Sequence, residues 1–269
     1  MSSVRIAVAS TPLTATLHDA VPVAIAAVEE AARLGARIVC LPETGLPGHR
    51  LQSRQVPDVS QKELDAAIDR VAAAAARRGV VTILGVERPT ARGREIVALV
   101  IGADGARLGE QVKTQVAPEE EPIYVAGTGR RTFTAAGLTF GIAICHEAFR
   151  YPEIARGAVL AGAQVIFVPH FLTHPGSTVP ERWCDVSSSY HEKALMCRAL
   201  ENGVYVATAN VSGDEQGSAT CVIAPDGSLL AQLPYGETGV LAVDLDLSRA
   251  DAHLARRWSP ERSGHRAGA

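Results

Sequence analysis

The sequence predicts an α/β fold in which two mixed β-sheets pack face to face and helices lie outside. Short apolar runs alternate with long helical patterns along the 269 residues, which is typical of α/β proteins. Two apolar stretches, 95–115 and 131–145, contain the turn signals ADG and AAG and are expected to form hairpins. Helical connections and hairpins occur in both halves without a low-complexity linker, so we expect a single domain over residues 1–269.

The first part of the chain is expected to alternate strands with long helices. Segment 17–36 is alanine-rich, has the amphipathic spacing of a helix and closes on Gly35. The pattern recurs over 61–79. Strands are expected around these helices, over 4–10, 37–43 and 80–87.

The second part of the chain repeats this alternation and then finishes with strands. The expected elements are a helix over 151–163, a strand over 164–170, a helix over 183–203, a strand over 204–210, a hairpin over 218–233 and a strand over 239–247. The tail, 258–269, is small and polar and is expected to be mobile.

Bulk composition excludes several classes of protein. A formal net charge of −3 argues against a nucleic-acid partner. No run approaches the roughly 18 apolar residues of a membrane span, and the first residues lack the pattern of a signal peptide. Five cysteines, an odd number at irregular spacing, favour reduced thiols. We therefore expect a cytoplasmic protein with neither a nucleic-acid nor a membrane partner.

Three ionisable residues each end an apolar or strand-like run: Glu43, Lys113 and Cys145. Side chains at strand ends converge at the edge of a sheet, where α/β proteins place their sites. A cysteine thiol, with a pKa of about 8.5, needs a base to become a nucleophile, and Glu43 is suited to that role. Lys113 and the backbone N–H of His146 are suited to stabilise the charge that develops on attack. Each residue alone is also compatible with a structural role, and the combination favours acyl transfer.

Several motifs resemble the nitrilase, or carbon–nitrogen hydrolase, superfamily, whose members use a Glu–Lys–Cys triad. They are RIVCLPETGLPG, VKTQVAPEEEPIYVAG and GIAICHEAFRYPE, supported by ALMCRALENGVYVATAN and SATCVIAPDGSLLA. The resemblance implies that Glu43 is the general base, Lys113 the lysine of the triad and Cys145 the nucleophile. By its spacing from Lys113, Glu120 corresponds to a second active-site glutamate. The resemblance also implies a four-layer αββα sandwich, a homodimer or higher homo-oligomer, and no cofactor or metal.

Two departures from the family pattern concern the substrate rather than the catalytic roles. Gln115 and Val116 replace the His-Leu found after the lysine in many relatives, and Cys-x-Asp of many amidases is absent. The resemblance implies hydrolysis of an amide or N-carbamoyl compound through an acylated cysteine. A helix beginning near Tyr151 is also placed to favour the thiolate.

Four further residues are candidates for substrate binding. Glu147 follows the nucleophile by two positions, and His170, Phe171 and Trp183 belong to a long proline-containing loop, a kind of loop that is often functional. A metal site is not expected, because neither H-E-x-x-H nor C-x-x-C occurs.

Other functions remain open at this point. Glu147 resembles the glutamate of true nitrilases, which read Cys-Trp-Glu, so a nitrile is the alternative substrate. A non-catalytic binding protein on the same fold is a second alternative, and a redox-sensing thiol is a third.

Overall fold

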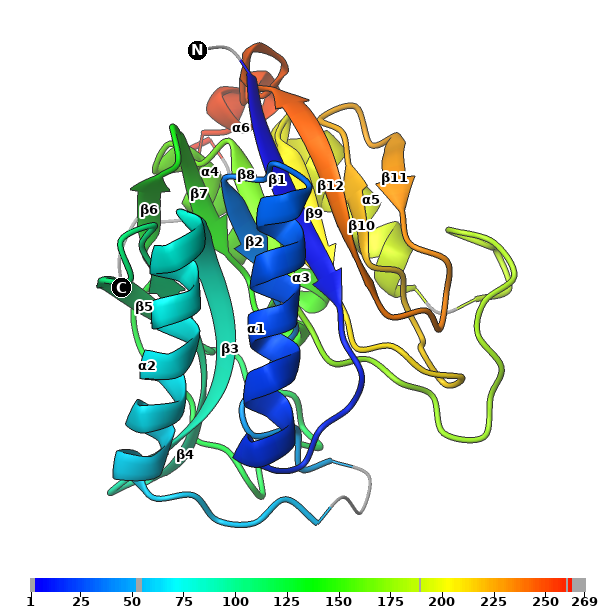
Figure 1. Cartoon of the computed structure of the whole chain (residues 1–269). Helices are drawn as coiled ribbons and strands as arrows, with labels where there is room; N and C mark the ends of the chain where they lie inside the picture. The colour runs from blue at the N-terminus through cyan, green and yellow to red at the C-terminus, as the bar shows by residue number, and fades with distance from the viewer. Residues whose placement is uncertain (1–2, 52–54, 189, 260, 263–269) are drawn as a thin grey trace.

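The computed structural model describes residues 3–51, 55–188, 190–259 and 261–262. Two six-stranded mixed sheets face each other, and helices cover the outer side of each (Figure 1). This is the four-layer αββα sandwich that the sequence predicts. The predicted tail, 258–269, lies largely outside the described residues, and its mobility remains a prediction.

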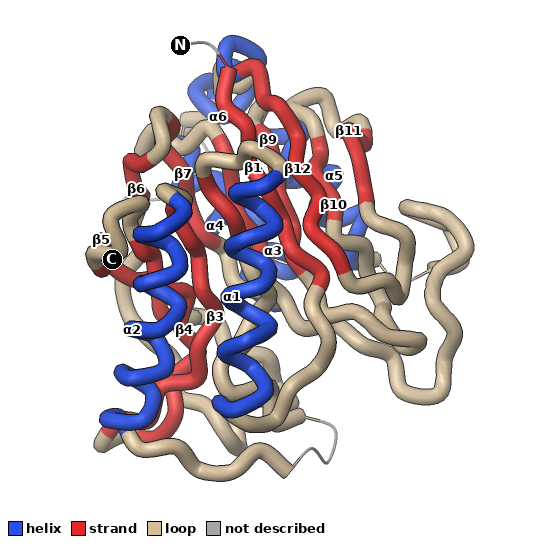
Figure 2. Tube along the Cα trace, in the orientation of Figure 1, coloured by secondary structure: helices blue, strands red, loops and turns tan. Residues whose placement is uncertain are grey.

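The first sheet has the strand order β12-β1-β2-β3-β4-β5. Its inner strands β1, β2 and β3 are parallel, whereas β12, β4 and β5 each join antiparallel to their neighbour. Two long helices lie on its outer face (Figure 2). The elements are β1 (Ser3–Ser10), α1 (Leu17–Arg33), β2 (Ile38–Cys40), α2 (Gln61–Arg78), β3 (Val81–Thr90), β4 (Gly93–Ile101), β5 (Arg107–Val112) and β12 (Gly239–Asp246).

The second sheet has the order β11-β10-β9-β8-β7-β6, with β7, β8 and β9 parallel. Its strands are β6 (Thr132–Ala135), β7 (Leu138–Ile142), β8 (Val165–Pro169), β9 (Tyr205–Ala209), β10 (Cys221–Ile223) and β11 (Leu229–Gln232). Its helices are α3 (His146–Arg150), α4 (Pro152–Leu160), α5 (His191–Asn202), the 3₁₀-helix η1 (Leu247–Arg249) and α6 (His253–Arg257). Among the described residues, no helix combines the length and apolarity needed to cross a membrane.

Local signals account for the ends of the two long helices. Thr16 caps α1 by accepting a hydrogen bond from the Asp19 N–H, and Ser60 forms a reciprocal capping box with Glu63 at the start of α2. Gly79 ends α2 in the left-handed conformation (φ 67°), which glycine adopts without steric cost.

The alternation of side chains in β1 explains why this sheet separates two apolar layers. Ile6 and Val8 belong to the core between the sheets, whereas Ala7 and Ala9 belong to the core beneath α1 and α2. A strand whose successive side chains point to opposite faces needs apolar residues at every position when both faces are covered.

Two predicted boundaries were wrong, and one short helix was missed. The chain becomes helical directly after Cys145, and Pro152, which has no N–H to donate, divides the helical segment into α3 and α4. Helix α5 begins at His191 rather than at 183. Strand β2 ends at Cys40 rather than at 43, because Glu43 already belongs to the turn that follows.

Candidate active site

Glu43 lies in the turn that follows β2, and the turn packs directly on β3. This approach depends on Gly85, where a Cβ would lie 2.1 Å from the carbonyl oxygen of Pro42. The Glu43 carboxylate is fully buried: Oε1 accepts a hydrogen bond from Lys113 Nζ (2.8 Å) and Oε2 accepts one from the Phe171 N–H (3.0 Å). Both oxygens are therefore held in fixed directions.

Lys113 follows β5 and is completely buried. Its Nζ donates to Glu43 Oε1 at 2.8 Å and to the Glu120 oxygens at 2.9 and 2.6 Å. Burial by itself lowers the pKa of Lys113, but the negative charges of Glu43 and Glu120 outweigh it and raise the pKa above its usual value. The side chain is therefore a permanent ammonium ion at the centre of the cluster.

Cys145 occupies a sharp turn between β7 and α3, with φ 49° and ψ −112°. A positive φ is strained for a residue with a Cβ, and such strain is commonly found at functional sites. The Cys145 N–H donates to the Pro169 carbonyl (3.0 Å), and Sγ donates to the Phe171 carbonyl (3.6 Å). Burial and the Glu43 carboxylate raise the pKa of the thiol well above its usual value, despite the opposing effect of Lys113. The sulfur at rest is therefore protonated.

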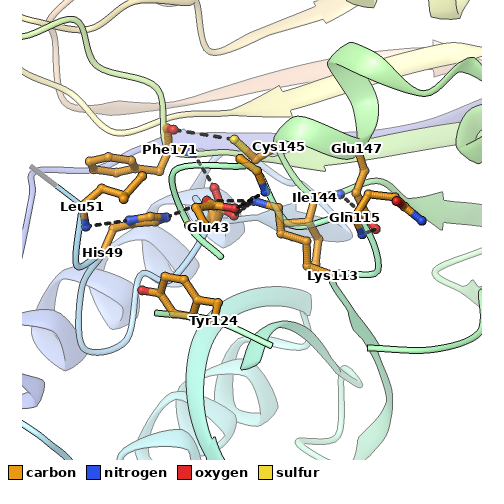
Figure 3. Close-up of polar contacts among 12 residues, drawn as sticks. Glu43, His49, Leu51, Lys113, Gln115, Tyr124, Ile144, Cys145, Glu147 and Phe171 are labelled. Atoms are coloured by element: carbon orange, nitrogen blue, oxygen red, sulfur yellow. Dashed lines mark hydrogen bonds and ion pairs between the residues drawn. The ribbon is translucent and has the colours of Figure 1, made fainter. Parts of the chain in front are cut away.

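The two sheets thus bring Glu43, Lys113 and Cys145 together from separate parts of the chain (Figure 3). The backbone of Phe171 connects the carboxylate and the thiol, since its N–H bonds Glu43 and its carbonyl accepts from Cys145. A protonated thiol beside a fixed carboxylate and a fixed ammonium ion is suited to proton removal coupled to nucleophilic attack.

Glu120, the predicted second glutamate, also accepts a hydrogen bond from the Lys113 ammonium (2.6 Å). Its Oε2 also accepts from the Ala117 N–H (2.9 Å), and its Oε1 lies 3.2 Å from His49 Nε2. Burial alone raises the pKa of Glu120, but the His49 hydrogen bond and the Lys113 charge lower it to about 2. Glu120 is therefore a carboxylate at neutral pH.

The His146 backbone lies where the sequence predicts an oxyanion donor. His146 is the first residue of α3, and a backbone N–H at that position has no acceptor within the helix. None of the described residues accepts a hydrogen bond from it. A helix does start near Tyr151, since Tyr151 is the N-cap of α4, but the shorter helix α3 begins directly after Cys145. Burial outweighs any effect of these helices on the thiol, because the pKa of Cys145 is raised.

The predicted substrate role of Glu147 does not agree with its environment. Its carboxylate is fully buried and accepts hydrogen bonds from the Thr114 N–H and hydroxyl (both 2.6 Å), the Gln115 N–H (3.2 Å) and the Ile144 N–H (2.9 Å). Arg130 forms an ion pair with it at 2.8 Å. Glu147 therefore ties the segment after Lys113 to the segment before Cys145, and it does not line the cavity.

A cavity of about 660 Å³ opens onto the thiol. Its lining includes Cys145, Phe149, Arg150, Phe171, Tyr190 and His191. Of the four residues predicted to bind substrate, Phe171 alone contributes to this lining.

His170 and Trp183 lie elsewhere. His170 is fully buried, and its Nδ1 lies 2.8 Å from the Thr208 hydroxyl. Trp183 packs against an apolar core cluster, beside Cys221. Both predictions rested on the length of the loop, which does not indicate the direction of a side chain.

Sequence reasoning missed His49, which contacts Glu120, because His49 directly follows the motif RIVCLPETGLPG and is not part of any motif considered there. Ligand atoms of His49, Glu43 and Glu120 lie within 4.8 Å of one another, a spacing that could hold a metal ion. The Lys113 ammonium, however, donates to both carboxylates of this set, and a cation placed between them would meet its charge.

A buried thiol, an ammonium ion and two carboxylates between the sheets of an αββα sandwich define the class of thiol hydrolases. The chain belongs to the carbon-nitrogen hydrolase family, whose model matches residues 5–253. This confirms the family and the type of enzyme that the motifs predict.

Solved structures of an amidase of the nitrilase superfamily from Nesterenkonia share the fold. A cysteine-to-alanine mutant of that amidase superposes with a TM-score of 0.81 at 26% identity, covering 98% of this chain and 97% of that one. Another structure of it, with a TM-score of 0.80, 26% identity and coverage of 97% and 96%, shows the acetamide moiety of fluoroacetamide added covalently to the active-site cysteine.

Curated relatives are named for two related activities. A protein of Pyrococcus abyssi named nitrilase is 30% identical over 231 residues, 82% of each chain. The omega-amidase of Mus musculus is 26% identical over 268 residues, covering 93% of this chain and 91% of its own.

Proposed function

We propose that this protein hydrolyses the C–N bond of small non-peptide amides through a thioester at Cys145. The observation that carries the proposal is the contact of Lys113 with both Glu43 and Glu120 beside a protonated thiol that opens onto a cavity. The amidase structures with the same fold support an amide, and the resemblance extends the class to N-carbamoyl compounds.

Acylation begins when Glu43 takes the proton of Cys145 as Sγ bonds to the carbonyl carbon. The C=O π electrons move to oxygen, and the oxyanion lies between Lys113 Nζ and the His146 N–H. Glu43 then returns the proton to the nitrogen, the C–N bond breaks, and ammonia or an amine leaves. The proton must move within this step because burial disfavours a free thiolate.

Deacylation uses the same groups in reverse. Glu43 takes a proton from water, the oxygen attacks the thioester carbon, and a second oxyanion forms at the same donors. The C–S bond then breaks, the acid leaves, and the proton returns from Glu43 to Cys145. Lys113 stays charged throughout, and Glu120 positions it.

A nitrile is the second candidate substrate, favoured by the relative of Pyrococcus abyssi that is named nitrilase. Addition of Cys145 to a nitrile forms a thioimidate, and its hydrolysis passes to the same thioester with loss of ammonia. Glu147, which suggested this reading, is held by backbone and Arg130 contacts and does not discriminate between the substrates.

The test is ammonia release from short aliphatic amides, ureido acids and nitriles, with Cys145→Ala as the control. We expect turnover of an amide by the wild type, none by the variant, and a mass increase on Cys145 equal to the acyl group in quenched reactions. Turnover of nitriles alone would support the second candidate. Absence of both turnover and acylation, with stable sulfenate formation by peroxide, would instead support the redox-sensing alternative.

Self-association and a cytoplasmic location also belong to the proposal. Exposed leucines on the three packed helices α4, α5 and α6, namely Leu160, Leu200 and Leu254, support a homo-oligomer formed through this face. Sedimentation of the wild type and of Leu200→Lys tests it: the variant should shift toward the monomer, and a monomeric wild type would contradict it.

A further inference from the structure

His49 is buried beside the glutamates and has a fixed orientation. Its ring stacks on Phe171, with centroids 4.3 Å apart and an interplanar angle of 13°, and Tyr124 meets it edge-on at 5.6 Å. Only 2% of the residue is exposed. Phe171 is also the residue whose backbone connects Glu43 with Cys145, so the ring packs against the framework of the site.

The hydrogen bonds of His49 determine its tautomer. The Leu51 N–H lies 3.3 Å from Nδ1, and because a backbone N–H can only donate, Nδ1 is the acceptor. The proton of a neutral ring is then on Nε2, which lies 3.2 Å from Glu120 Oε1. His49 is therefore a hydrogen-bond donor to Glu120.

This donor makes the two glutamates unequal. Both contact the Lys113 ammonium, so the cluster holds two negative charges against one positive charge, and one carboxylate accepts a proton more easily than the other. Glu43 has one additional donor, the Phe171 N–H, whereas Glu120 has two, the Ala117 N–H and His49. The extra donor favours the charged form of Glu120 and leaves Glu43 to take the proton.

We propose that His49 is a positioning residue that keeps Glu120 in its carboxylate form, so that Glu43 serves as the only proton acceptor for Cys145. The inference rests on the proposed function for the roles of Glu43 and Cys145. The titratable groups around His49 and Glu120 include Lys113, Glu43, Cys145, His146 and Tyr124.

The test is the pH dependence of Cys145 alkylation by iodoacetamide, measured by peptide mass spectrometry. His49→Phe keeps the ring stack without a donor, His49→Gln restores a donor near Nε2, and His18→Phe is an exposed control. The alkylation rate should fall at low pH, and in His49→Phe we expect this acid limb of the pH–rate profile to move up by about one pH unit. The limb should stay in place in His49→Gln and in the control. A rate that falls equally at every pH in His49→Phe, with no shift of the limb, would overturn the proposal.

Two further measurements separate the possible failures. Histidine ¹⁵N shifts in the wild type should show the His49 proton on Nε2 and an unprotonated Nδ1 that accepts from the Leu51 N–H, and a proton on Nδ1 would refute the proposal even if His49→Phe does not fold. An acid limb that persists in Glu43→Gln would count against Glu43 as the base, and hence against the proposed function. A wild type that releases no ammonia, yet shows the expected tautomer and limb shift, would contradict the proposed function and leave the inference standing.

Discussion

Replacing Glu147 by glutamine should destabilise the fold strongly, because this carboxylate holds together the two segments that carry Lys113 and Cys145. One oxygen accepts from the N–H groups of Thr114 and Gln115, the other accepts from the Ile144 N–H, and Arg130 contacts both. An amide NH₂ in place of either oxygen would face hydrogen-bond donors and would leave the guanidinium without its charge partner.

The magnitude follows from the burial of the pair. Breaking a buried ion pair by removing one partner costs about 3–5 kcal/mol. Glu147 is fully buried while the Arg130 side chain is 29% exposed, and water therefore compensates in part. We expect a loss of about 3 kcal/mol, at the lower end of that range. This corresponds to a decrease in Tm of about 6–12 °C for a chain of this size.

Urea unfolding and thermal denaturation of Glu147→Gln measure the loss, and steady-state kinetics on an amide accompany them. Displacement of the two segments should reduce kcat by about tenfold to a hundredfold. Glu119→Gln, on the exposed lining of the cavity, is the matched control and should keep wild-type stability. A Glu147→Gln protein that unfolds like the wild type but has a raised KM would refute this reasoning and restore Glu147 as a substrate ligand.

Two other predictions concern pH and packing. Burial lowers the pKa of His170 to about 4 and that of His191 to about 3. As the pH falls below about 6.5, these histidines therefore bind protons in the unfolded chain before they do so in the folded protein. The free energy of unfolding at pH 5 should be lower than at pH 8 by about 2 kcal/mol per histidine. Urea unfolding at both pH values should show this decrease, roughly halved in His170→Gln, and constant stability would contradict it. Gly85→Ala places a Cβ 2.1 Å from a backbone carbonyl of the Glu43 turn and should cost about 1–3 kcal/mol together with most of the activity. Gly157→Ala meets no atom within 4 Å and lies inside α4, so it should keep the activity and lose no stability, because alanine favours a helix interior more than glycine does. Wild-type activity in Gly85→Ala would show that the turn can move without consequence.

The sequence predicted the layers because apolar periodicity and caps are local properties. Strand β1 carries apolar residues on both faces, so other elements must pack on both sides of its sheet. The capping box of Ser60 and Glu63 marks the start of a helix. The pairing of β12 with β1 could not be read in this way, since it joins strands more than two hundred residues apart, Ser3 lying opposite Asp246. Local pattern identifies a strand, but long-range packing selects its partner.

The same division applies to the site. The sequence by itself singled out Glu43, Lys113 and Cys145 by their types at the ends of strand-like runs, and the family resemblance added Glu120 by its spacing from Lys113; their catalytic roles stay predictions. Only the tertiary structure decided that Glu147 faces inward onto backbone donors and that His49 donates to Glu120. It also decided that the thiol is protonated at rest. Charge state and hydrogen-bond partners depend on burial and on groups distant in sequence, and neither is encoded in the residues adjacent to the group itself.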